Sequence, residues 1–208
     1  KIYYFRESLF FRFKRSEFVQ GKIDYVNSID SSFKDEILTQ NGKLNPKYKN
    51  SINLLTGPYL NTEYIGFYLG NKKSLTNSKK LRQAINLGID RKKMMRFLRN
   101  NIGNPANHGF VPVGLIGTQT KGYEYDLKKS MRLVNEYKSE SKLEKIELTI
   151  STDSNYIGII EFIQRELLKV GVNIKIDVLP PSIEKLELAG WLLMGSGSNP
   201  NTNEERIT

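Results

Sequence analysis

Two stretches of strictly alternating apolar residues, separated by one helical segment, constrain the fold of this chain most. Every second position is apolar over 146–150 and again over 172–178, which is the pattern of a half-buried strand. Between them apolar residues recur with the helical period as far as Gly171, which suits a left-handed C-terminal cap. The sequence therefore predicts a βαβ unit over 146–178 with parallel strands and Asp153 or Ser154 as the helix N-cap. The inner helical face comprises Tyr156, Ile159, Ile160, Ile163, Leu167 and Val170.

A second helical pattern runs from residue 79 to about residue 100 and is interrupted at 88–90. Gly88 is a poor helix former and Asp90 is a good N-cap, so the pattern predicts two helices rather than one. Ser78 is expected to cap the first helix, and Ile89 to pack on the second as a hydrophobic staple. The expected inner faces are Leu81, Ala84, Ile85 and Gly88 on the first helix, and Met94, Phe97 and Leu98 on the second.

The remaining elements are shorter. Capping residues predict helices over 8–20, 31–40 and 126–137, and apolar runs predict strands over 23–26 and 64–69. The connection over 101–125 is rich in glycine and proline and long for a plain linker, so it is a candidate functional loop. Strands that alternate with helices indicate an α/β domain.

Composition describes a folded domain and disfavours two other classes of chain. The sequence has 208 residues, 38% of them hydrophobic, and no apolar run near the roughly 20 residues that span a bilayer. The start lacks an initiator Met, so the chain is expected to be part of a longer protein. The net charge is +10, but the basic residues are scattered, and no nucleic-acid partner is expected.

No residue pattern points to catalysis or to a bound cofactor. The chain has no cysteine, and its one histidine, His108, lies in a loop without a second ligand at metal-binding spacing. No phosphate-binding loop, dinucleotide fingerprint or nucleophile elbow occurs. The stretch 195–199 is rich in glycine and serine but reads as a turn rather than a phosphate cradle. We expect no enzyme activity, no metal and no cofactor.

Several segments, taken in order, resemble the family 5 solute-binding proteins of ABC importers, which include oligopeptide, dipeptide and nickel receptors. The most specific is Leu-Arg-Gln-Ala-Ile-Asn-Leu-Gly-Ile-Asp-Arg over 81–91, which is similar to the family's Arg-Gln-Ala segment leading to Ile-Asp-Arg. Weaker similarities lie at 18–24, 59–67, 109–114, 122–129, where Leu127 replaces the usual proline, and 189–191. The resemblance covers most of the chain.

The resemblance implies a periplasmic-binding-protein type II fold, the Venus flytrap, in which two lobes close over a solute. The family's chains are much longer than this one. Residues 1–208 are therefore expected to form a single α/β lobe with a mixed sheet flanked by helices, with 195–208 as a flexible tail. The implied partners are a peptide-like small solute, the missing second lobe and an ABC permease. The implied location is periplasmic or extracytoplasmic, with a membrane anchor in a segment outside this chain.

Four residues are candidates for contact with the solute. Trp191 corresponds to a tryptophan that lines the family's cleft, although a single tryptophan can equally be part of the core. Peptide receptors of the family place an aspartate three residues later, where this chain has Met194, and the stretch from Pro181 to Trp191 is shorter than the family's. Asn27, Tyr64 and Asn107 are polar residues at predicted strand ends or in the 101–125 loop.

Two other functions remain open at this point. A ligand-sensing domain of a transcriptional regulator would share the fold, and a helix-turn-helix elsewhere in the protein would favour it. An unrelated basic α/β protein that binds nucleic acid would show strongly salt-dependent binding to random duplex. The ligand could also be a nickel complex or an oligosaccharide rather than a peptide.

Overall fold

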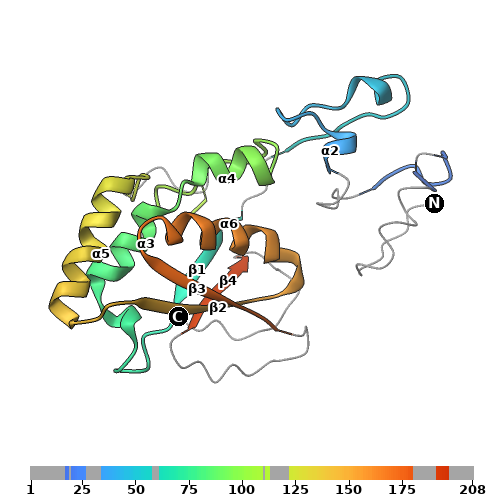
Figure 1. Ribbon diagram of the computed structural model, residues 1–208. Helices are drawn as coiled ribbons and strands as arrows, with labels where there is room; N and C mark the ends of the chain where they lie inside the picture. The colour runs from blue at the N-terminus through green and yellow to red at the C-terminus, as the bar shows by residue number, and fades with distance from the viewer. Residues whose placement is uncertain are drawn as a thin grey trace. The chain divides into compact units, whose positions relative to one another are not determined.

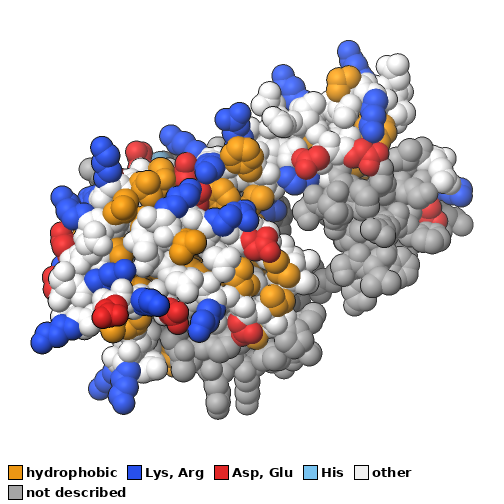
Figure 2. Space-filling model, viewed as in Figure 1, with side chains coloured by type: hydrophobic (Ala, Val, Ile, Leu, Met, Phe, Trp, Pro, Cys, Tyr) orange, Lys and Arg blue, Asp and Glu red, His pale blue; other side chains and the backbone are white. Residues whose placement is uncertain are grey.

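The computed structural model describes residues 17–18, 20–26, 34–57, 61–109, 111–112 and 122–179, and the backbone of 191–196. The chain divides into two compact units. The first contains residues up to Leu55 together with Asn100–Ile102, and the second contains Thr56–Arg99 and the rest of the chain from Gly103. Lysine and arginine side chains are spread over the face seen in Figure 2, as the sequence predicts.

The second unit is built on a four-stranded mixed sheet. Its strands are β1 (Glu63–Phe67), β2 (Ile146–Thr152), β3 (Val172–Val178) and β4 (Trp191–Ser196), in the order β1-β4-β2-β3. Strand β2 is parallel to β3 and to β4, whereas β1 is antiparallel to β4. The strands predicted over 146–150, 172–178 and 64–69 are therefore confirmed, and so is the parallel βαβ unit.

Helix α6 (Ile157–Leu168) connects β2 to β3 and covers one face of the sheet. Asp153 was one of two expected N-caps, but it caps the 3-10 turn η4 (Ser154–Tyr156), and α6 itself begins without a side-chain cap. Gly171 ends the connection with a φ of +81°, the left-handed conformation that favours glycine. The buried core between this helix layer and the sheet includes Ile146, Leu148, Ile150, Val172, Ile174, Ile159, Ile160, Ile163 and Leu167.

Helices α3 (Lys79–Gly88) and α4 (Arg91–Leu98) confirm the interruption predicted at 88–90. The Ser78 hydroxyl accepts a hydrogen bond from the Leu81 amide, and the Asp90 carboxylate accepts one from the Lys93 amide. Phe97 was expected on the inner face of α4 but is 60% exposed, which contradicts that prediction. The inner face is instead occupied by Met94 and Leu98, which pack against the core.

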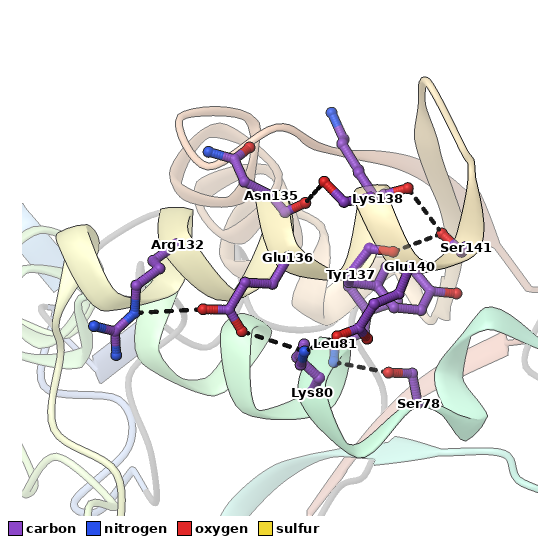
Figure 3. Close-up of polar contacts among 11 residues, drawn as sticks. Ser78, Lys80, Leu81, Arg132, Asn135, Glu136, Tyr137, Lys138, Glu140 and Ser141 are labelled. Carbon is purple, nitrogen blue, oxygen red and sulfur yellow. Dashed lines mark hydrogen bonds and ion pairs between the residues drawn. The ribbon is translucent and has the colours of Figure 1, made fainter.

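Helix α5 (Leu127–Ser141) begins at the predicted N-cap, Asp126, and continues four residues beyond the predicted end. Figure 1 shows α3 between α5 and α6. At the α3–α5 interface, Lys80 forms ion pairs with Glu136, at 3.2 Å, and with Glu140 (Figure 3). Because both glutamates are exposed, these ion pairs stabilise the contact of the two helices only modestly.

Close backbone packing of α3 against α5 and α6 depends on Gly88. A Cβ atom at this position would lie 2.9 Å from Ser130 Oγ and 3.2 Å from Leu167 Cδ2. Ser130 is fully buried and donates a 2.7 Å hydrogen bond to the Ala84 carbonyl oxygen. The glycine that predicts a break in the helical pattern therefore also lets three helices approach one another.

A buried carboxylate joins α4 to α6. Glu166 is 2% exposed, and its Oε1 accepts hydrogen bonds from Lys169 Nζ at 2.6 Å and Lys93 Nζ at 3.1 Å. Burial alone would raise the pKa of Glu166, but the hydrogen bonds and positive charges of Lys169 and Lys93 outweigh it. The pKa of this carboxyl therefore lies below its ordinary value, and Glu166 stays ionised between two cations.

The described part of the first unit is organised around Asn100. Its side-chain amide donates to Asp35 Oδ1 at 3.0 Å and to the Thr39 carbonyl at 3.2 Å, and its oxygen accepts from Lys34 Nζ at 2.8 Å. Asn100 is 3% exposed and has a φ of +48°. These bonds anchor α2 (Lys34–Ile37), while the 3-10 turn η2 (Pro46–Tyr48) bonds to α2 through Tyr48 and Glu36.

Four expectations in the first 40 residues and at the end of the chain have different outcomes. Residues 23–26 form no strand, because they lack a pairing partner among the described residues. The helix predicted over 31–40 is limited to α2 in the described part, because Leu38 leaves it to pair with Leu44 in an isolated bridge. Gly195 and Ser196, assigned to the tail, are the last residues of β4, and most of the helix predicted over 8–20 lies outside the described residues.

Candidate functional site

One edge of the sheet collects the carboxyl ends of its three parallel strands. Strands β2, β3 and β4 end there at Thr152, Val178 and Ser196, and β1, which runs the other way, begins there at Glu63. In open α/β sheets, ligands bind outside the carboxyl ends of the strands. A ligand site is therefore expected at this edge of the sheet.

Two buried hydroxyl groups lie at this edge without a hydrogen-bond partner among the described residues. Ser151 Oγ and Thr152 Oγ1 belong to the last two residues of β2, which are 0% and 3% exposed. A buried hydroxyl that makes no hydrogen bond costs about 1–3 kcal/mol, so such groups call for an explanation. A ligand that supplies a donor or an acceptor would remove that cost.

The two hydroxyls belong to opposite faces of β2. Thr152 follows Ile146, Leu148 and Ile150 on the face that α6 covers, whereas Ser151 shares the other face with Glu147 and Thr149. That second face is polar on β3 as well, where Asp177 is the register partner of Ser151. The second face is thus polar on both strands, while the core face is apolar up to Thr152.

The chain leaves β2 through a tightly bonded turn. The Asp153 carboxylate accepts a 2.7 Å hydrogen bond from the Asn155 amide, and the Thr152 carbonyl accepts one of 2.8 Å from the Leu179 amide. These bonds fix the backbone on both sides of the unpaired hydroxyls. The hydroxyls are therefore held by a rigid frame, as a binding site requires.

Among the residues predicted to contact a ligand, Tyr64 lies at this edge. It is the second residue of β1, pairs with Gly195 of β4, and is 38% exposed. The ladder also contains Trp191, whose backbone lies opposite Thr149, two residues before the unpaired hydroxyl of Ser151. Tyr64 therefore lies at the carboxyl edge, whereas Trp191, as the first residue of β4, lies at the other end of that strand.

The other two predicted residues are not brought to the edge by any described contact. The Asn107 amide donates to the Pro105 carbonyl at 2.9 Å, and a Cβ atom at Gly122 would lie 1.6 Å from the Asn107 carbonyl oxygen. The backbone of Gly122 therefore lies close to that of Asn107. Asn27 lies outside the described residues, and His108, expected to face solvent, is exposed.

Two further searches of the described residues give negative results. In the part of the chain that the structure describes, no helix is long and apolar enough to cross a membrane. Within the same residues, no group of three or more His, Cys, Asp or Glu side chains is placed to hold a metal ion.

Comparison with known families identifies the chain. The sequence profile of the bacterial extracellular solute-binding proteins, family 5, matches residues 14–204. The chain belongs to this family. A search of the curated proteins gives no match. The family resemblance expected from the Arg-Gln-Ala and Ile-Asp-Arg segments is thereby confirmed.

Solved structures of family members share the fold. The chain is similar to NikZ from Campylobacter jejuni in complex with Ni(L-His), with a TM-score of 0.66 and 22% identity over 91% of this chain. It is also similar to OppA from Listeria monocytogenes bound to peptide, with a TM-score of 0.65 and 22% identity over 88% of this chain. The substrate-binding protein CtaP from Listeria monocytogenes has a TM-score of 0.69 at 17% identity over 89% of this chain.

The chain covers a similar share of each of these three structures. The chain covers 38%, 37% and 37% of the lengths of those three structures. It thus spans a little over a third of such proteins, and its α/β fold is that of one lobe of a periplasmic binding protein. The predicted fold class is confirmed.

Proposed function

We propose that this family 5 chain forms one lobe of the receptor of an ABC importer, which captures a peptide-like solute outside the cytoplasm and delivers it to a membrane permease. The family profile over residues 14–204 is the observation that carries the proposal. Solute-binding proteins of this family bind and release a solute without changing it. We accordingly propose that the chain performs no catalysis.

The proposal of a peptide solute is supported by what the similar structures contain. The Listeria monocytogenes OppA is bound to a peptide, and a Bacillus subtilis oligopeptide-binding protein, AppA, is in complex with a nonapeptide. An extended peptide offers backbone donors and acceptors at regular spacing. The hydroxyl groups of Ser151 and Thr152 can hydrogen-bond to backbone donors as well as to backbone acceptors, so the peptide's side chains would not affect these bonds.

We further propose that the solute lies against the carboxyl edge of the sheet. Ser151 and Thr152 would hydrogen-bond to it, and Tyr64 would pack beside it. Trp191, which begins β4 at the end away from this edge, remains a proposed contact through its flat apolar surface. Asn107 and Asn27 remain proposed contacts without a described link to this edge. The second lobe, outside this chain, would close over the solute and contribute the remaining contacts.

The location follows from the same proposal. A receptor of this family acts in the periplasm or at the outer face of the membrane, and we propose an anchor in a segment outside this chain. The permease would recognise the closed receptor. A regulator that senses the same solute would share the fold, and its full sequence would contain a DNA-binding domain.

Thermal unfolding of the full-length protein tests the function. The probes are a mixture of tri- to pentapeptides, nickel with histidine, and maltooligosaccharides. A ligand present at 100 times its Kd stabilises the folded protein by about 2.7 kcal/mol, which raises the melting temperature by several degrees. We expect the peptide mixture to produce this rise. A higher melting temperature only with nickel and histidine, or only with the sugars, would show that the solute is of that class instead of a peptide. No change in melting temperature with any probe would contradict the proposal that the chain belongs to a solute receptor.

A further inference from the structure

Helix α4 presents an unusually basic surface. Residues 91–99 contain five lysine or arginine residues and no acidic residue. Lys92, Lys93 and Arg96 are exposed, and no ion pair joins Lys92 or Arg96 to an acid among the described residues. A cationic surface of this kind attracts anionic partners.

Large apolar side chains are exposed beside these cations. Phe97 is 60% exposed and follows Lys93 by one helical turn, so the two side chains lie next to each other on α4. On α6, Leu168 is 61% exposed and precedes the exposed Lys169. Cations with large apolar side chains beside them are the composition of a surface that meets the interface of a bilayer.

The two helices form one continuous surface. Glu166 accepts hydrogen bonds from Lys93 of α4 and from Lys169, the residue that follows α6. Lys93 Nζ also lies 5.9 Å from the centre of the Phe162 ring of α6. Figure 2 shows basic and hydrophobic side chains next to one another over the region of α4 and α6. We call the exposed side chains of Lys92, Lys93, Arg96, Phe97, Leu168 and Lys169 the α4–α6 surface.

Acidic groups near this surface reduce its charge only in part. Glu166 lies beneath it and is buried, Asp90 is occupied in capping α4, and Glu161 is exposed on α6. Lys92 and Arg96 have none of these as an ion-pair partner. The outermost part of the surface, on α4, therefore remains cationic.

We propose that the α4–α6 surface docks onto an anionic lipid bilayer. Lysine and arginine bind at the level of the lipid phosphates, while exposed phenylalanine and leucine side chains reach the boundary of the acyl chains. Charge alone would also suit a nucleic acid. The apolar side chains favour lipid, because a phosphate backbone offers Leu168 no apolar surface to contact.

Vesicle co-sedimentation of the full-length protein tests this inference. The probes are vesicles of phosphatidylcholine alone and vesicles that contain one third phosphatidylglycerol, in 0.1 M salt. The measured quantity is the partition coefficient for the anionic vesicles divided by that for phosphatidylcholine vesicles. A membrane anchor raises both coefficients by the same factor, so it does not change this ratio. Because each cation near an anionic surface changes partitioning by about fivefold, Lys92→Gln with Arg96→Gln should lower the ratio by about 25-fold.

A matched pair of controls separates this surface from overall charge. Lys128→Gln with Lys129→Gln removes the same charge from exposed positions of α5 and should leave the ratio within about twofold. Phe97→Ser should lower binding to the anionic vesicles by about fivefold, whereas Met131→Ser, at an exposed position of α5, should not change it.

Several results would overturn the proposal. Equal binding of the wild-type protein to both kinds of vesicle would do so, as would equal losses in the α4 and α5 charge variants. Unchanged binding by both Phe97→Ser and Leu168→Ser variants would show that neither apolar side chain enters the bilayer. Retention on random duplex DNA that the α4 variant abolishes, without binding to vesicles, would assign the surface to nucleic acid instead.

Discussion

Substitution of Gly88 by alanine should destabilise the protein, although alanine is the better helix former. In an exposed helix interior, Gly→Ala stabilises by about 1 kcal/mol. At Gly88 the new Cβ atom would lie 2.9 Å from Ser130 Oγ and 3.2 Å from Leu167 Cδ2, and both are shorter than ordinary contacts. The sign of the change therefore depends on whether these two neighbours can move.

The structure indicates that neither neighbour can move freely. Ser130 Oγ is held by its 2.7 Å hydrogen bond to the Ala84 carbonyl, which contributes about 1 kcal/mol, and Leu167 is fully buried in the core. Overpacking a buried site costs about 1–3 kcal/mol. Gly88 is the last residue of α3, so the gain in helix propensity is at most about 1 kcal/mol. A packing cost of about 2 kcal/mol then leaves a net destabilisation of about 1 kcal/mol or slightly more.

Urea unfolding of the full-length protein measures this difference, with Gly158→Ala as the matched control. Gly158 is also helical, in α6, and a Cβ atom there would meet nothing within 4 Å. That variant should be stabilised by about 0.5 kcal/mol. Opposite signs at the two glycines would support the packing, whereas stabilisation by Gly88→Ala would refute the close approach of α3 to α5 and α6.

Two further substitutions test side-chain hydrogen bonds, one set within the second unit and one within the first. Glu166→Gln should destabilise by about 2 kcal/mol at pH 7, because Lys93 and Lys169 lose a buried partner but remain partly solvated. The pKa of Glu166 is lower in the folded state than in the unfolded state. The carboxylate therefore contributes its full stabilisation above the unfolded-state pKa, near 4.3, and loses it as the pH falls through the folded-state pKa. The unfolding curves of wild type and variant should therefore converge in acid. Asn100→Ala should cost about 3 kcal/mol, because it removes three hydrogen bonds of a buried side chain and places alanine at a positive φ. Asn101→Ala is the matched control: Asn101 also has a positive φ, of +57°, but loses one exposed hydrogen bond, so it should cost about 1 kcal/mol. Circular dichroism during urea unfolding measures both.

The elements that the sequence predicts correctly have two independent signals each. The βαβ unit combines alternation over 146–150 and 172–178 with a helical period between them. The break between α3 and α4 combines a glycine with a capping aspartate. The predicted strand over 23–26 rests on three apolar residues in four, and so short a segment forms a strand only where a partner strand is present.

Phe97 shows a different limit of sequence reasoning. It falls one position from Leu98, so the helical period allows either residue to face the core. The direction from which α6 approaches α4 decides between them, and that direction depends on tertiary packing. The same holds for Glu166, whose charge predicts exposure but whose two lysine partners allow burial.

The candidate site was predictable only in part. Tyr64 was expected at a strand end and lies there, and Trp191 was expected from the family resemblance. Ser151 and Thr152 escaped notice because a serine and a threonine at a strand end are usually solvated. The sequence does contain a signal for them. The alternating strand 146–150 is followed directly by the polar run Ser-Thr-Asp-Ser-Asn, which marks a strand end rich in hydrogen-bonding groups.

Solute binding by a full-length variant with Ser151→Ala and Thr152→Val tests the central claim most directly, because the account predicts opposite effects on stability and binding. Removing two unpaired buried hydroxyls should stabilise the solute-free protein by about 1–2 kcal/mol. The same change should weaken the Kd for a bound peptide, measured by isothermal titration calorimetry, by about tenfold or more. A Kd equal to that of the wild-type protein would contradict a solute site at the carboxyl edge of the sheet.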